Sequence, residues 1–269
     1  SYMLVRAALR ADPGNDRARL LLAGLLSKDG ATDRAIAELA TIRSDSIYYR
    51  NALAGRVQLL ADSGRRPDAI ALARTLAEAP DATIDDIRRL ADLYMGEENA
   101  VAAAPLYRAL IDRRGAAADG LDWLQYGAAL DRAGQWPAAR EALERAVALA
   151  PMDAMTLNYL GYGLVEHGER LDVARAMLEK AARLKPDDPA IADSLGWAYF
   201  RLGEAMRALP LIEAAATTDP GNAEIGEHLG DVYWRAGRRF EARYAWNAAR
   251  SVATGAAATR LDGKIADGL

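Results

Sequence analysis

The sequence predicts an all-α fold, a right-handed superhelical solenoid of helix–turn–helix repeats. The first observation is a pair of residues, a large one and then glycine, that recurs at intervals of 34, 35 and 34 residues: Tyr126-Gly127, Leu160-Gly161, Leu195-Gly196 and Leu229-Gly230. The second is another glycine seven residues after each pair, at positions 134, 168, 203 and 237. A fixed period of about 20 to 50 residues is typical of proteins built from stacked repeats.

Each recurring position has a mechanical reason. The glycine of the pair lets two helices approach closely, and small residues recur on the facing helix, at positions 139, 174, 208 and 242 and again at 146, 181, 215 and 249. The later glycine can adopt the positive φ that ends a first helix. Proline then stops the second helix, at positions 151, 186 and 220. One repeat is therefore a helix, a tight turn and an antiparallel helix.

The period divides the chain into seven repeats, and we expect residues 1–269 to form a single solenoid domain. The expected repeats cover residues 16–49, 50–83, 84–119, 120–153, 154–188, 189–222 and 223–256. Residues 1–15 resemble the second helix of a preceding repeat, which suggests a natural chain that extends further toward its N-terminus. Residues 257–269 place Leu261, Ile265 and Leu269 on one face and predict a capping helix.

The pattern weakens toward the N-terminus. Arg56 stands where a leucine is expected, and Glu98 stands where the turn glycine should be. The stretch from Gly115 to Gly120 adds two residues to its repeat and predicts a loop or a flexible joint.

Composition excludes several classes of function. The formal charge of -4 and the pI of about 5.4 argue against affinity for nucleic acid. No apolar run is long enough to span a membrane directly. Cysteine is absent, which removes disulfides, thiolate catalysis and zinc–thiolate sites.

The lack of recognisable catalytic motifs predicts a protein that is not an enzyme, with no cofactor and no metal site. The two histidines, His167 and His228, lack a second ligand at metal-binding spacing and are interpreted as structural. No nucleotide-binding, zinc-protease or nucleophile-elbow motif is present. Paired acids such as Asp85-Asp86 and Asp187-Asp188 stand where helices begin, so capping explains them better than acid–base work.

Aromatic side chains provide the candidate binding surface. Trp123, Trp136 and Trp246 occupy positions that fill the seams between helices, whereas Trp197 and Trp234 occupy first-helix positions that face the inside of the superhelix. Interfaces concentrate their energy in Trp, Tyr and Arg. The predicted inner strip consists of Asn158, Tyr162, Asp193, Trp197, Phe200, Arg201, Glu227, Asp231, Trp234 and Arg235. The alternative is that Trp197 and Phe200 pack against neighbouring first helices.

The repeat resembles the tetratricopeptide repeat in its length and in each of these positions. Residues 154–269 are also similar to a group of bacterial proteins with this repeat, many of them exported or lipid-anchored in the cell envelope. The resemblance rests on the longer turn before Leu171-Asp172, the box Asp193-Ser-Leu-Gly-Trp197 and the stretch His228-Leu-Gly-Asp231. Some of these relatives are adaptors of carboxyl-terminal-processing proteases. The resemblance implies a periplasmic or envelope location, with the cytoplasm as the alternative.

The resulting hypothesis is a non-catalytic scaffold, an adaptor or assembly factor, that holds a protein or an extended peptide. The clamp that related repeats use for a terminal carboxylate needs Lys and Asn on successive first helices. Asn158 fits one such position, but Tyr162 and Asp193 do not. Two alternatives remain: a solenoid that associates with itself as a homo-oligomer, and the regulatory arm of a larger enzyme.

Overall fold

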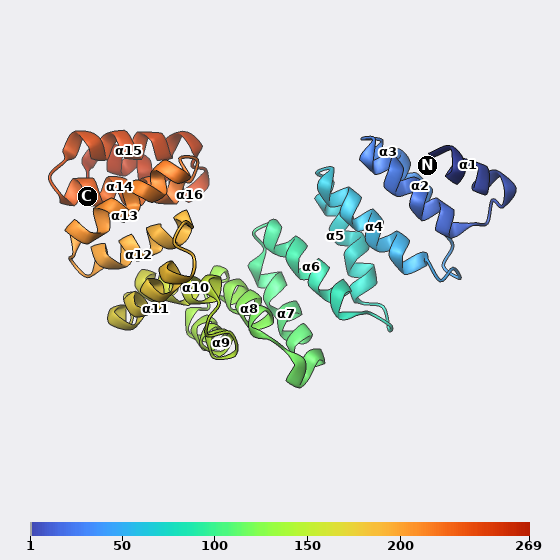
Figure 1. Cartoon of the computed structure of the whole chain (residues 1–269), viewed down its shortest axis with the longest axis horizontal. Helices are drawn as coiled ribbons and strands as arrows, with labels where there is room; N and C mark the ends of the chain where they lie inside the picture. Colours follow the sequence, from blue (N-terminus) through green and yellow to red (C-terminus); the bar gives the residue numbers. More distant parts are fainter. Residues whose placement is uncertain (1) are drawn as a thin grey trace. The chain divides into compact units, whose positions relative to one another are not determined.

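The computed structural model describes residues 2–269, and these residues form sixteen α-helices, one short 3₁₀ turn and no strand (Figure 1). Successive helices pack as antiparallel pairs, each pair being one helix–turn–helix repeat. The all-α class and the repeat architecture predicted from the sequence are thereby confirmed.

Contacts between Cα atoms divide the chain into two compact units. The N-terminal unit comprises the residues up to Ala118 together with Ala129–Gln135, and the C-terminal unit comprises Asp119–Ala128 and Trp136–Leu269. The first boundary between the units, after Ala118, falls inside the predicted joint at 115–120, where the chain also forms the 3₁₀ turn η1 (Gly115–Ala117). The number of domains stays a prediction.

The helices of the N-terminal unit follow the predicted repeats. Residues 1–15 contain α1, and each of the next three repeats contains two helices: α1 (Tyr2–Ala11), α2 (Asp16–Lys28), α3 (Thr32–Ala40), α4 (Tyr49–Asp62), α5 (Arg66–Ala77), α6 (Ile84–Gly96) and α7 (Ala100–Arg114). The last part of α8 (Gly120–Arg132) also belongs to this unit.

The C-terminal unit continues the same alternation. It contains the first part of α8, followed by α9 (Trp136–Leu149), α10 (Ala154–Glu166), α11 (Leu171–Leu184), α12 (Pro189–Arg201), α13 (Ala205–Thr218), α14 (Ala223–Arg235), α15 (Arg239–Val252) and α16 (Gly255–Asp267). The first helices α10, α12 and α14 also contact one another in sequence, and this contact positions the candidate site.

Side-chain caps explain where several helices begin. The Asp188 carboxylate accepts hydrogen bonds from the backbone N–H groups of Ala190 and Ile191 at the start of α12. Thr83 and Asp86 form a capping box at the start of α6. Carboxylates at these positions satisfy free N–H groups and face the positive end of the helix dipole. The capping role predicted for Asp86 and Asp188 is confirmed.

Backbone conformation explains the turn glycines and one exception. Gly203 between α12 and α13 has a φ of 82°, a conformation that costs other residues energy. Glu98 occupies the equivalent place between α6 and α7 and has a φ of 57°. The weak third repeat therefore keeps the turn geometry without its glycine, at the expense of local strain.

Close helix packing explains the glycine of the repeated pair. A Cβ atom added to Gly196 on α12 would lie 2.5 Å from Ile212 Cγ1 on α13, which is too close for any real side chain. Trp246 on α15 and Trp136 on α9 are both buried and fill seams between helices, as predicted.

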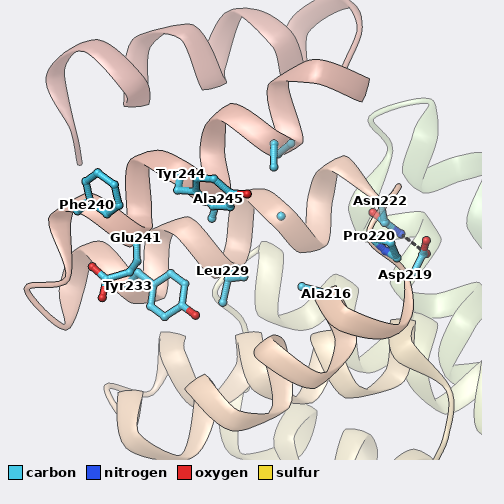
Figure 2. Close-up of a pocket in the computed structure, with 13 residues that line it drawn as sticks. Ala216, Asp219, Pro220, Asn222, Leu229, Tyr233, Phe240, Glu241, Tyr244 and Ala245 are labelled. Carbon is cyan, nitrogen blue, oxygen red and sulfur yellow. Dashed lines mark hydrogen bonds between the residues drawn. The ribbon is translucent and has the colours of Figure 1, made fainter.

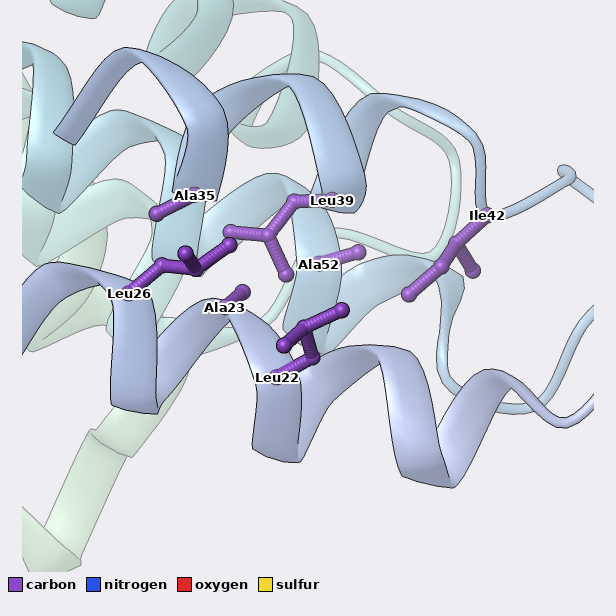
Figure 3. Close-up of a cluster of buried hydrophobic side chains, with 7 residues drawn as sticks. All are labelled: Leu22, Ala23, Leu26, Ala35, Leu39, Ile42 and Ala52. Atoms are coloured by element: carbon purple, nitrogen blue, oxygen red, sulfur yellow. The ribbon is translucent and has the colours of Figure 1, made fainter. Parts of the chain in front are cut away.

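Hydrophobic clusters form the core of both units. In the N-terminal unit, leucine, isoleucine and alanine side chains from α2, α3, the turn after α3 and the start of α4 pack together: Leu22, Ala23, Leu26, Ala35, Leu39, Ile42 and Ala52 (Figure 3). In the C-terminal unit, Leu261 of α16 is fully buried against Trp246, with Ile265 beside it. The predicted capping helix is therefore present and packs on the last repeat.

Candidate functional site

A buried polar seam joins the first helices of the C-terminal unit. Nδ1 of His228 on α14 lies 2.8 Å from Oδ2 of Asp193 on α12. The His228 ring stacks on Trp197, with ring centroids 4.0 Å apart and planes 11° apart. Trp197 also donates a hydrogen bond from Nε1 to Glu166 at 2.7 Å and stacks on Phe200. Because Trp197 is only 8% exposed, most of its surface contacts protein, as the packing alternative expects.

The charge of Asp193 and the burial of the ring shift the pKa of His228 in opposite directions. Burial alone would lower the pKa of its imidazole, but the charge and hydrogen bond of Asp193 outweigh burial and raise that pKa above its ordinary value. Glu224 and Glu166 add to the increase. Asp193 therefore favours the protonated form of His228 in the seam.

The capping helix neutralises two other acids of the predicted strip. Arg260 donates to both oxygens of Glu227, at 3.2 and 2.9 Å. Lys264 donates to Asp231 at 2.8 and 2.7 Å and lies 2.8 Å from Glu227. Burial raises the pKa of Asp231, against the opposing effect of Lys264, and Trp246 Nε1 also donates to it at 2.9 Å. These acids are engaged within the chain.

An open pocket lies where α12 and α14 end. A cavity of about 400 Å³ is lined by Phe200, Arg201 and Arg235, together with Gly203 and Ala205 of the turn into α13. Arg201 is 3.9 Å from the Glu166 carboxylate, too far for a hydrogen bond. The Arg235 side chain is exposed and has no hydrogen bond or ion pair within residues 2–269. We call Phe200, Arg201 and Arg235 the arginine pocket.

The remaining residues of the predicted strip are half-buried. Tyr162 donates from its hydroxyl to Glu224 at 2.5 Å, and burial followed by the charge of Glu224 raises the pKa of that hydroxyl. Trp234 contacts Trp246 and is covered by the guanidinium group of Arg239 at 3.8 Å. Asn158 keeps one buried amide oxygen without a hydrogen-bond partner among the described residues.

Burial therefore divides the predicted strip. Four members have little surface left for a ligand: Asp193, Trp197, Glu227 and Asp231. Three members meet in the arginine pocket. Whether any of the ten contacts a ligand stays a prediction.

The two cations that neutralise these acids were not among the predicted site residues. Arg260 and Lys264 follow Glu227 and Asp231 by 33 residues each, close to the repeat period. That offset places them on α16 at the positions equivalent to Glu227 and Asp231 on α14. The 33-residue spacing could have indicated these ion pairs, but the apolar residues of α16 predicted only a capping helix.

Neither a metal-binding cluster nor a membrane-spanning helix is found in residues 2–269. No group of three or more His, Cys, Asp or Glu side chains there is arranged to hold a metal ion. None of the helices in this range is both long and apolar enough to cross a membrane.

Comparison with known proteins identifies the family. A model of the tetratricopeptide repeat matches residues 105–251, more than half of the 269 residues. The chain belongs to the tetratricopeptide repeat family. A second tetratricopeptide repeat model matches residues 2–46, which include the weak first repeat. No curated protein matches the chain.

Solved structures show the same tetratricopeptide repeat fold. A tetratricopeptide repeat protein from Parabacteroides merdae superposes with a TM-score of 0.76 at 13% identity, covering 93% of this chain and 97% of the other. Cut9 and Hcn1 form an APC/C hetero-tetramer, and a chain from that structure has a TM-score of 0.68 at 16% identity, covering 99% of this chain and 52% of the other. A thermophilic protein with this repeat from Thermus thermophilus has a TM-score of 0.58 at 21% identity, over 67% of this chain and 98% of the other. At these identities the likeness concerns the fold alone.

Proposed function

We propose that this tetratricopeptide repeat chain is a non-catalytic scaffold, an adaptor or assembly factor that holds a protein or an extended peptide through the arginine pocket. The observation that carries the proposal is the exposed pair Arg201 and Arg235 beside Phe200, at the end of an otherwise packed seam. Repeat arrays of this kind commonly present extended binding surfaces.

The chemistry of the pocket favours an acidic segment of the partner. Guanidinium groups bind carboxylates through planar pairs of hydrogen bonds, and arginine beside an aromatic ring is enriched among residues that dominate binding energy. Glu166 supplies the nearest carboxylate to Arg201, and its 3.9 Å separation leaves that guanidinium able to turn toward a ligand.

The buried seam supports this role by holding the pocket rigid. Phe200 stacks on Trp197 at 5.0 Å between centroids, and Trp197 is itself fixed between His228 and Glu166. A contact surface whose side chains are already ordered loses less entropy when a partner binds.

The narrower role, an adaptor of a protease in the bacterial envelope, is supported by the resemblance of residues 154–269 to envelope proteins with this repeat. A periplasmic location belongs to the same proposal. This narrower role predicts that the captured partners include a carboxyl-terminal-processing protease.

Affinity capture tests the proposal. The intact chain and the Arg201→Ala/Arg235→Ala variant are used in parallel on bacterial envelope and cytoplasmic extracts, and retained proteins are quantified by mass spectrometry. We expect at least one protein to be depleted about tenfold or more with the variant, the equivalent of about 1.4 kcal/mol. Identical captures contradict a role for the pocket, and capture of the chain's own sequence alone favours the self-associating alternative.

A further inference from the structure

A second cavity lies against the last repeat. It has a volume of about 490 Å³ and lies over α14, between the end of α13 and the length of α15. Figure 2 shows Leu229 and Tyr233 of α14 and Phe240 and Tyr244 of α15 around it. Phe240 is 83% exposed and Tyr244 is 73% exposed, so aromatic surface continues from the cavity to solvent. We call this cavity the outer groove.

One lining position of the outer groove carries a smaller side chain than its equivalent in the preceding repeat. Ala245 lines the groove, and the residue at the matching position 34 residues earlier is Leu211. The floor residues Leu229 and Tyr233 are half-buried, whereas their equivalents Leu195 and Tyr199 are only 6% and 5% exposed. The floor of the groove is therefore more exposed than the equivalent floor in the preceding repeat.

The rim of the groove also differs in charge from the preceding repeat. Asp219 and Glu241 line it, and the residues 34 positions earlier are Lys185 and Arg207. Both rim positions thus change from basic to acidic.

The positive charge of Arg238 does not neutralise the acidic rim. Arg238 lies 3.0 Å from Glu241 and 3.4 Å from Glu213, so one cation faces two carboxylates. Asp219 accepts one hydrogen bond from the neutral amide of Asn222 at 3.2 Å. The rim keeps net negative charge.

We propose that the outer groove is a second docking site, which binds a basic peptide segment of a partner protein through an inserted apolar side chain. The apolar floor receives the side chain, and lysine or arginine residues on either side of it face Asp219 and Glu241. Burial of an apolar side chain supplies the affinity, and complementary charge selects the segment. This site is independent of the arginine pocket, whose charge has the opposite sign.

A phage-displayed library of random peptides provides the probe. The library is selected on the intact chain, and the binding of individual synthetic peptides is then measured by fluorescence anisotropy. We expect enriched peptides that carry Leu, Met or Phe next to Lys or Arg. Ala245→Leu, which restores the residue of the preceding repeat, weakens their binding about tenfold or more. Asp219→Lys/Glu241→Arg, which restores the charges of the preceding repeat, has the same effect without changing the core.

Two control variants establish that the effect belongs to the outer groove. Ala176→Leu makes the same change at an exposed position of α11 and leaves peptide binding unchanged. Arg201→Ala/Arg235→Ala also leaves it unchanged, because the arginine pocket is a different surface. The proposal is overturned if no groove-dependent peptide is selected, if the selected peptides are acidic, or if neither groove variant weakens binding. Circular dichroism establishes that each variant is folded.

Discussion

His228 and Asp193 form a buried ion pair between two first helices of the C-terminal unit. Their Nδ1 and Oδ2 atoms are 2.8 Å apart, and the side chains are 7% and 6% exposed. Trp197 stacks on the imidazole of His228. The same place therefore combines a charged hydrogen bond, an aromatic stack and the packing of α12 against α14. The arginine pocket lies at the end of this arrangement.

This pair predicts a specific dependence of stability on pH. The folded-state pKa of His228 is raised above its unfolded value of about 6.5. Its contribution to the free energy of unfolding is therefore complete below about pH 6.5 and is lost as the pH rises through the folded-state pKa. Urea denaturation across this range measures the loss. Asp193→Asn removes the facing charge and should reduce or reverse the slope; equal slopes in the two proteins argue against the ion pair.

Trp197→Ala should destabilise the chain strongly. The substitution removes a buried ring that contacts His228 and Phe200, and such changes typically cost about 3–5 kcal/mol of unfolding free energy. Arg235→Ala is the matched control at the surface and should leave unfolding nearly unchanged. If the two variants unfold at the same urea concentration, Trp197 is not part of the packed seam.

Lys264→Met tests the link between the capping helix and the seam. Lys264 faces Asp231 and Glu227, and removing it leaves Asp231 buried with its charge uncompensated, which costs about 3 kcal/mol. The double variant Asp231→Asn/Lys264→Met removes both charges and should recover part of that loss. Arg250→Met breaks the more exposed pair with Asp262 and should have a much smaller effect. Additive losses in the double variant contradict the coupling.

Glu98→Gly should stabilise the N-terminal unit. The positive φ of Glu98 strains a residue with a Cβ atom, whereas glycine adopts it freely. The greater flexibility of glycine in the unfolded chain offsets part of this gain, so the free energy of unfolding should rise by about 0.5 kcal/mol. Glu97→Gly, one residue earlier, has no such strain to relieve and should destabilise. A lower thermal midpoint for Glu98→Gly than for the parent would disprove the strain.

The repeat architecture could be predicted from the sequence because the spacing of small residues directly encodes helix packing. Gly196 recurs with its neighbours at the repeat period, and its missing Cβ is what allows Ile212 to approach. The capping helix was predictable for a similar reason, since the spacing of Leu261 and Ile265 marks one apolar face.

The accessibility of the candidate site was not predictable in the same way. Periodicity predicts that Trp197 and Arg235 face inward, but it does not predict how closely the next first helix approaches. The approach of the next first helix determines that Trp197 is covered by His228, whereas Arg235 remains exposed. The outer groove could not be predicted from the repeat pattern, because Ala245 fits that pattern as well as leucine does.

The dissociation constant of the captured partner tests the central claim most directly. Isothermal titration of that partner into the intact chain, Arg235→Glu and the control Ala176→Leu compares the arginine pocket with an unrelated surface in the same fold. We predict that Arg235→Glu raises the dissociation constant about tenfold or more while Ala176→Leu leaves it unchanged. Equal dissociation constants for all three proteins would contradict a binding role for the arginine pocket.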